Sequence, residues 1–89
     1  MKFEWDTGKA DTNLRKHGFS FEIAARSVED ELSATFPDPD HSSGEMRLTN
    51  YPLAQDGRLL VIPHTEKSGT IRIISAQVAT SRERKRYET

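Results

Sequence analysis

The spacing of hydrophobic residues in the first thirty positions predicts a short strand followed by two helices. Phe3 and Trp5 alternate with polar residues, which is typical of a strand that carries both aromatic rings on one face. Asp6 can cap a helix that runs to about Lys16, and Gly18 can end it because glycine tolerates a left-handed backbone. Ser20 can cap a second helix, in which the hydrophobic residues share one face: Phe21, Ala24, Ala25 and Val28.

The rest of the chain has the patterning of strands and turns. Four segments alternate or are rich in hydrophobic residues: 32–36, 46–51, 58–63 and 70–76. Segment 58–63 is hydrophobic on both faces and should be a central strand. Asp56 and Gly57 predict a hairpin before it, and residues 65–69 predict a turn after it.

The C-terminal segment predicts a last, highly charged helix over residues 82–88, capped by Thr80 or Ser81. The order of elements then predicts an α+β fold. It has a short N-terminal strand and two helices packed on an antiparallel sheet of three to four further strands, with a short C-terminal helix.

Length and composition narrow the classes of protein. With 89 residues and no cysteine, the sequence predicts a single domain over residues 1–89, without disulfides or cysteine-bound zinc. No hydrophobic run approaches the ~20 residues that span a bilayer, so we expect a cytoplasmic protein with no membrane partner. Nucleotide-binding glycine loops and the HExxH and GxSxG motifs are absent.

Charge is unevenly distributed although the net charge is only −1. Residues 1–40 carry nine acidic and five basic side chains, whereas residues 41–89 carry five acidic and eight basic ones. The basic half is the one whose charge suits binding to phosphate groups. The acidic, helical half does not.

Two candidate sites lie around the last two predicted strands. Arg72 stands among isoleucines, so it must face the open side of the sheet, where it serves either a salt bridge or a phosphate. His64 stands at the predicted strand end, followed closely by Lys67. A histidine can exchange protons near neutral pH and a lysine can hold an anion, but a lone histidine here is more often structural.

Two further candidates lie before the third strand and at the C-terminus. Glu45 and Arg47 are two residues apart, so on a strand they share a face, as a general base beside a phosphate clamp or as an ordinary charged pair. Residues 38–41 contain two aspartates and a histidine, but turn chemistry explains them better than a metal site. The terminal helix offers Arg82, Lys85 and Tyr87 to an RNA backbone and base, or simply to solvent.

Taken together, the residues resemble the BrnT toxin family over nearly the whole chain. Three parts of the chain carry the resemblance. The first is residues 3–6 with Lys9 and residues 13–24, and the second is residues 36–42 with 44–47. The third is the C-terminal part, over residues 56–61, 64–67, 71–76, 82–84 and 87–88. The family often has arginine where this chain has Lys67 and Gln77. An arginine-to-lysine change keeps the charge but loses bidentate phosphate binding.

The resemblance implies a RelE-like fold and a ribonuclease toxin of a type II toxin-antitoxin system. It further implies metal-independent cleavage of RNA without a cofactor, arrest of translation, neutralisation by a BrnA-type antitoxin, and contact with operator DNA only through that antitoxin. The site residues that it carries over are Trp5, Glu45, Arg47, His64, Arg72 and Tyr87.

These residues suggest a mechanism for cleavage. Arg47 and Arg72 would clamp the phosphate with help from Lys67, while Glu45 and His64 would serve as base and acid in either order. A base of the RNA would stack on Tyr87 or Trp5, and the basic terminal helix would add Arg82 and Lys85. Two alternatives remain open, a non-catalytic nucleic-acid-binding regulator and a protein-interaction module.

Overall fold

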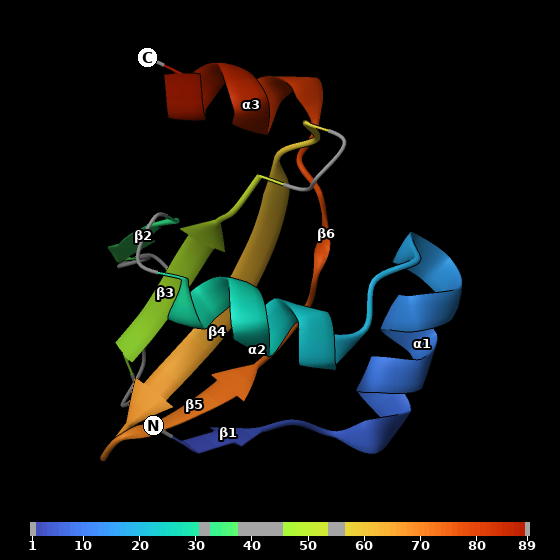
Figure 1. Ribbon diagram of the computed structural model, residues 1–89, viewed down its shortest axis with the longest axis vertical. Helices are drawn as coiled ribbons and strands as arrows, with labels where there is room; N and C mark the ends of the chain where they lie inside the picture. The colour runs from blue at the N-terminus through green and yellow to red at the C-terminus, as the bar shows by residue number, and fades with distance from the viewer. Residues whose placement is uncertain (1, 31–32, 38–45, 54–56, 89) are drawn as a thin grey trace.

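The computed structural model describes residues 2–30, 33–37, 46–53 and 57–88, and in the last turn of the chain it describes the backbone of residues 86–88 without their side chains. The elements follow one another in this order (Figure 1): β1 (Lys2–Glu4), α1 (Thr7–His17), α2 (Phe21–Glu29), β2 (Ala34–Pro37), β3 (Met46–Tyr51), β4 (Leu60–Lys67), β5 (Thr70–Ile73), β6 (Gln77–Val78) and α3 (Ser81–Glu88). The predicted α+β class is confirmed.

One mixed sheet holds the six strands in the order β1-β5-β4-β3-β2, with β6 paired to β4 beyond β5. Neighbours are antiparallel except β1, which runs parallel to β5. The strands after β1 pair antiparallel as expected, but β6 makes five of them instead of three to four, and the parallel pairing of β1 makes the whole sheet mixed. Both depend on pairing between distant segments, which alternation within a segment does not reveal.

The helix boundaries follow the predicted caps. The Asp6 carboxylate accepts the Lys9 N–H at 3.0 Å to begin α1, and Gly18 ends it with a φ of 79°. The Ser20 hydroxyl accepts the Ile23 N–H at 3.2 Å to begin α2. At α3 the cap is Thr80, whose hydroxyl and N–H exchange hydrogen bonds with Glu83 in a capping box.

Strand β4 is longer than the sequence predicted. The expected turn over residues 65–69 is wrong, because β4 continues to Lys67 and the turn contains only Ser68 and Gly69. Pro63 does not stop the strand, since its carbonyl still accepts the Ile74 N–H at 3.0 Å and the register with β3 continues on both sides of it. The predicted hairpin before β4 agrees with the antiparallel pairing of β3 and β4, although Asp56 lies outside the described residues.

The hydrophobic core lies between α2 and one face of the sheet, which we call the core face. Figure 1 shows α2 crossing this face of β4. Its buried members are Phe21 and Ala24 from α2 and, from the strands and the segment after them, Ile62, Ile71, Ile73 and Ala76. The opposite face of β3, β4 and β5, which we call the outer face, carries the polar and charged residues Arg47, Thr49, Thr65, Lys67, Thr70 and Arg72, together with Pro63 and the buried Val61.

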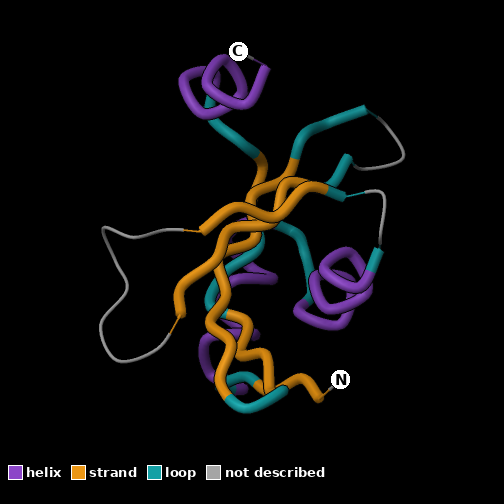
Figure 2. Tube along the Cα trace, turned by 90° about the vertical axis from the view of Figure 1, so that its left-hand side faces the viewer, coloured by secondary structure: helices purple, strands orange, loops and turns teal. Residues whose placement is uncertain are grey.

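Helix α3 lies at one end of the molecule, far from β1 and the turn between β4 and β5, as both views show (Figures 1 and 2). Its described side chains are mostly exposed. No helix in the described part of the chain is long and hydrophobic enough to cross a membrane.

Candidate functional site

A row of polar side chains crosses the outer face of three strands. Thr65 in β4 is the register partner of Arg47 in β3 on one side and of Arg72 in β5 on the other. Register partners in a sheet point to the same face, so the two arginines flank Thr65. Since neighbouring strands lie ~4.8 Å apart, the arginine Cα atoms are roughly 10 Å apart. That separation suits two guanidinium groups converging on one phosphate.

Strand β1 extends this row with a carboxylate. Glu4 is the register partner of Arg72, and its Oε1 accepts a hydrogen bond from Arg72 Nη1 at 3.3 Å. The side chains are 47% exposed for Arg72 and 50% exposed for Glu4, so this ion pair is solvated and easily rearranged. Arg72 can therefore bind a substrate anion without leaving a buried charge unpaired.

A shallow hollow of about 280 Å³ lies at the β1 end of the row. It is lined by Glu4, Thr65, Lys67, Ser68, Thr70 and Arg72. The two-residue turn shapes its rim, because Ser68 and Gly69 both have positive φ, 51° and 80°, as a tight hairpin of the type I′ kind requires. The turn pairs Lys67 with Thr70, so the lysine stands on the same face as Arg72. The hollow thus combines two cations, a carboxylate and three hydroxyl groups.

His64 does not join this row. It is the register partner of Leu48 and Ile73, so it faces the core, where it is 1% exposed and its Nδ1 lies 3.0 Å from the Ile62 carbonyl oxygen. This carbonyl can only accept, which assigns the Nδ1 proton to the histidine. Burial lowers the pKa of His64, against smaller raising effects of the Ile62 carbonyl and the Glu66 charge. In this fold His64 is a neutral core residue that does not reach a substrate on the outer face.

Trp5 also lies on the core side. Its ring packs edge-on against Phe21, with ring centroids 6.1 Å apart and an interplanar angle of 88°, and it is half-buried against the core cluster. The structure thus brings together Arg47, Lys67 and Arg72 among the predicted residues, and it places Trp5 and His64 on the other face.

The remaining predicted residues lie elsewhere. Arg82 and Lys85 are exposed on α3, which lies at the opposite end of the molecule from the turn between β4 and β5 that borders the hollow (Figures 1 and 2). Tyr87 belongs to α3, where the structure describes its backbone but not its side chain. Glu45 lies outside the described residues. Among the residues that are described, no three histidine, aspartate or glutamate side chains are grouped closely enough to hold a metal ion.

Sequence reasoning missed Glu4 and Thr65. Glu4 looked like an ordinary polar residue of a short strand, and Thr65 was assigned to a turn. The signal for Glu4 is the parallel pairing of β1 with β5, which joins residues 68 positions apart. Thr65 follows from the alternation of β4 once the strand is allowed to pass Pro63.

Comparisons with known proteins agree on one family. The family model of the ribonuclease toxin BrnT of type II toxin-antitoxin systems matches residues 5–83. The crystal structure of the ribonuclease toxin BrnT of Brucella abortus has the same fold, with a TM-score of 0.67 and 21% sequence identity over 91% of this chain and 99% of that chain. A search of curated proteins gives no match.

Proposed function

Because this chain belongs to the BrnT family of ribonuclease toxins of type II toxin-antitoxin systems, we propose that the outer face of its sheet cleaves RNA without a metal ion. The observation that carries the proposal is the row Glu4, Arg72, Thr65 and Arg47 across four neighbouring strands. It puts a carboxylate, a hydroxyl group and two arginines on one face of the sheet, where Glu4 and Arg72 are half-exposed and Arg47 is partly buried, with its Nε atom covered. An open, shallow site of this kind admits a polynucleotide.

The cations bind the phosphate that is cleaved. Arg72 binds its non-bridging oxygens from one side and Arg47 from the other, and Lys67 adds charge at the rim. As the attacking oxygen approaches phosphorus, negative charge accumulates on these oxygens, so fixed cations stabilise the transition state more than the ground state. Lys67, where the family often has arginine, supplies this charge without bidentate geometry.

Glu4 is the general base. Its carboxylate accepts the proton of the 2′-hydroxyl group, the 2′ oxygen attacks phosphorus, and the bond to the 5′ oxygen breaks. The leaving oxygen takes a proton from Lys67 or water, so the products carry a 2′,3′-cyclic phosphate and a 5′-hydroxyl group. Glu45, two positions before Arg47, is the second candidate for the base.

The other predicted residues have secondary roles. Arg82 and Lys85 lie on α3, at the opposite end of the molecule from the turn between β4 and β5, and would contact only a longer RNA. Tyr87 belongs to the same helix and would add a stacking contact to that longer RNA. His64 and Trp5 support the sheet from the core side. The RelE-like fold stays a prediction.

The biological setting follows from the family. A type II system implies an antitoxin, and we expect one of the BrnA type that covers the outer face and contacts operator DNA itself. Released from it, the toxin cleaves RNA in the cytoplasm and arrests translation. An acidic segment of the antitoxin would be the natural competitor for the two arginines.

The test is to incubate the purified protein with RNA in the presence of EDTA. We expect cleavage products with cyclic phosphate ends. Glu4→Gln should lower kcat by about 100-fold or more with little change in KM, because a general base contributes about 10²- to 10⁴-fold. Glu4→Asp should retain part of the rate.

Glu22→Gln is the matched control, since this exposed carboxylate lies on α2 away from the outer face. It should cleave like the wild type.

For the wild-type protein, binding of RNA without cleavage would identify a non-catalytic regulator. Absence of RNA binding would identify a protein-interaction module. Wild-type activity in Glu4→Gln would remove Glu4 from the mechanism and leave Glu45 as the base.

A further inference from the structure

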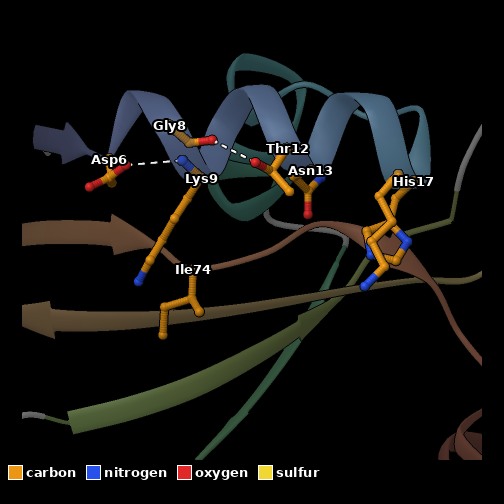
Figure 3. Close-up of a pocket in the computed structure, with 8 residues that line it drawn as sticks. Asp6, Gly8, Lys9, Thr12, Asn13, His17 and Ile74 are labelled. Atoms are coloured by element: carbon orange, nitrogen blue, oxygen red, sulfur yellow. Dashed lines mark hydrogen bonds between the residues drawn. The ribbon is translucent and has the colours of Figure 1, made fainter.

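A second hollow, of about 530 Å³, lies between α1 and the strands, and the proposed mechanism does not use it (Figure 3). Its walls include Asp6, Lys9, Asn13, Lys16, His17 and Ile74. Figure 3 shows Lys9, Asn13 and His17 pointing from one side of α1 toward the strands, where Ile74 lies. The hollow therefore has a hydrophobic floor and a rim with three basic side chains.

This hollow continues the cleavage site along β5. Ile74 is two positions after Arg72, and its N–H still bonds to the Pro63 carbonyl oxygen, so the strand direction persists and the two side chains share a side. At the near end, the pKa of Asp6 is lowered mainly by the hydrogen bond from the Lys9 N–H, and the positive charges of Lys9 and, least of all, Arg72 add to this effect. An RNA strand held at Arg72 would reach this hollow with its next nucleotide.

Helix stability does not explain Lys9, one of the three basic residues of the rim. Lys9 lies in the first turn of α1, which contains no acidic residue, and a cation there opposes the helix dipole. Asp6 already satisfies the N-terminal backbone through its cap. Lys16 and His17 do suit the C-terminal end of the dipole, yet both also line the hollow. Lys9 and Lys16 are seven positions apart, so their Cα atoms are about 10 Å apart along the helix axis.

Hydrogen bonds of Asn13 hold α1, which forms one wall of the hollow, in a fixed position. Asn13 is buried and donates to the carbonyl oxygens of Phe19 at 3.0 Å and Ala76 at 2.8 Å. Its Oδ1 accepts from the Ala76 N–H at 3.1 Å and the Ser75 hydroxyl at 3.2 Å. These bonds fix α1 to the segment after β5, so the hollow needs no rearrangement to accept a ligand.

We propose that the hollow beneath α1 is a subsite for the nucleotide adjacent to the cleaved phosphate, with its base between Ile74 and the His17 ring and its phosphate on Lys9 and Lys16. The inference rests on the proposed function, because its ligand is the same RNA. Hydrophobic and histidine surfaces accept bases of any sequence, and the flexible lysines follow the backbone. The Asp6 carboxylate repels phosphate, which places the phosphate toward the Lys16 end.

The test compares Lys16→Ala with Arg15→Ala, which removes the same charge from the neighbouring exposed residue outside the hollow. Binding is measured with a ten-nucleotide 2′-O-methyl RNA, which lacks the attacking hydroxyl group and cannot be cleaved. Lys16→Ala should weaken binding roughly three- to tenfold and lower the slope of log affinity against log salt by about 0.7, the value for one phosphate contact on a single strand. Arg15→Ala should change neither quantity appreciably.

A dinucleotide substrate with a single phosphate provides the second readout. Lys16→Ala should cleave it like the wild type while showing a raised KM for a ten-nucleotide RNA. Equal effects of Lys16→Ala and Arg15→Ala on binding would overturn the subsite, as would a loss of dinucleotide cleavage in Lys16→Ala. Unchanged RNA binding with weaker antitoxin binding would assign the hollow to the protein partner instead. If the wild type cleaves neither substrate, the proposed function fails, but the binding comparison still decides the subsite.

Discussion

His64 and Thr65 are adjacent in β4 and have opposite surroundings. His64 is 1% exposed on the core face, whereas Thr65 lies on the outer face between two arginines. The face on which His64 lies stabilises the fold, and the face on which Thr65 lies carries the candidate functional groups. A residue of suitable type is therefore a functional candidate only if the alternation of the strand places its side chain on the outer face.

The largest expected effect is on the core face and concerns stability. Ile62 has no exposed surface, so Ile62→Ala leaves a cavity and should lower the free energy of unfolding by about 2–5 kcal/mol. Urea denaturation measures this change. For a small domain this is a large part of the total stability. A loss below about 1 kcal/mol would mean that the site collapses around the smaller side chain.

The second effect is on the outer face and concerns activity. Arg72→Ala should lower kcat/KM for RNA by about 100-fold, equivalent to about 2.7 kcal/mol of transition-state stabilisation. Its stability should stay within ~0.5 kcal/mol of the wild type, because the pair with Glu4 is half-exposed. The kcat/KM of Arg72→Lys should lie between that of the wild type and that of Arg72→Ala.

Arg26→Ala, on the exposed side of α2, is the matched control and should cleave RNA normally. The comparison between the faces fails if Arg72→Ala unfolds the domain or if Arg26→Ala is equally inactive.

The third effect is a pH dependence of stability from the core face. Burial holds the pKa of His64 below its ordinary value of 6.5, so the unfolded chain takes up a proton more readily than the folded one. The free energy of unfolding should therefore fall as the pH drops below about 6.5, before the carboxylates begin to titrate. Denaturation curves between pH 7 and pH 5 measure this slope.

His64→Gln should flatten that slope, and an NMR titration of the His64 ring reports the same pKa if this variant folds poorly. A ring that titrates at or above 6.5 would contradict its assignment to the core face.

The smallest effect concerns Thr65, the neighbour of His64. Thr65→Val keeps the shape and removes a hydroxyl group that is within the row of the outer face, so KM should rise by no more than about tenfold, as for one hydrogen bond of ~1 kcal/mol. Stability measured by thermal unfolding should barely change. A larger loss of kcat would give Thr65 a direct part in the chemistry.

Local signals in the sequence were sufficient for the helices. Asp6, Ser20 and Gly18 cap α1 and α2 as predicted, because a cap depends on hydrogen bonds and dihedral angles within a few residues. The same holds for the capping box at Thr80. Strand ends were harder, since a strand continues wherever a neighbour offers partners, and β4 passes Pro63 for that reason.

The candidate site was predicted in part. Arg47, Lys67 and Arg72 were identified from residue type and alternation, and they do share the outer face. Glu4 was missed, and His64 was grouped with Arg47 and Arg72 although it shares the alternation of Ile62, because which residues share a face depends on which strands lie next to each other. That information is held by the register of β1, β3 and β5 with their partners.

The sequence by itself determined the α+β class, the caps of the helices and the family. It also indicated that basic residues in the second half of the chain could meet phosphate. Only the tertiary structure decided where the charges gather. Glu4, Lys9 and Lys16 belong to the acidic half, yet Glu4 lies beside Arg72 and the two lysines line the hollow that continues from it. The physical reason is that charge acts through space over several ångströms, whereas composition counts it along the chain.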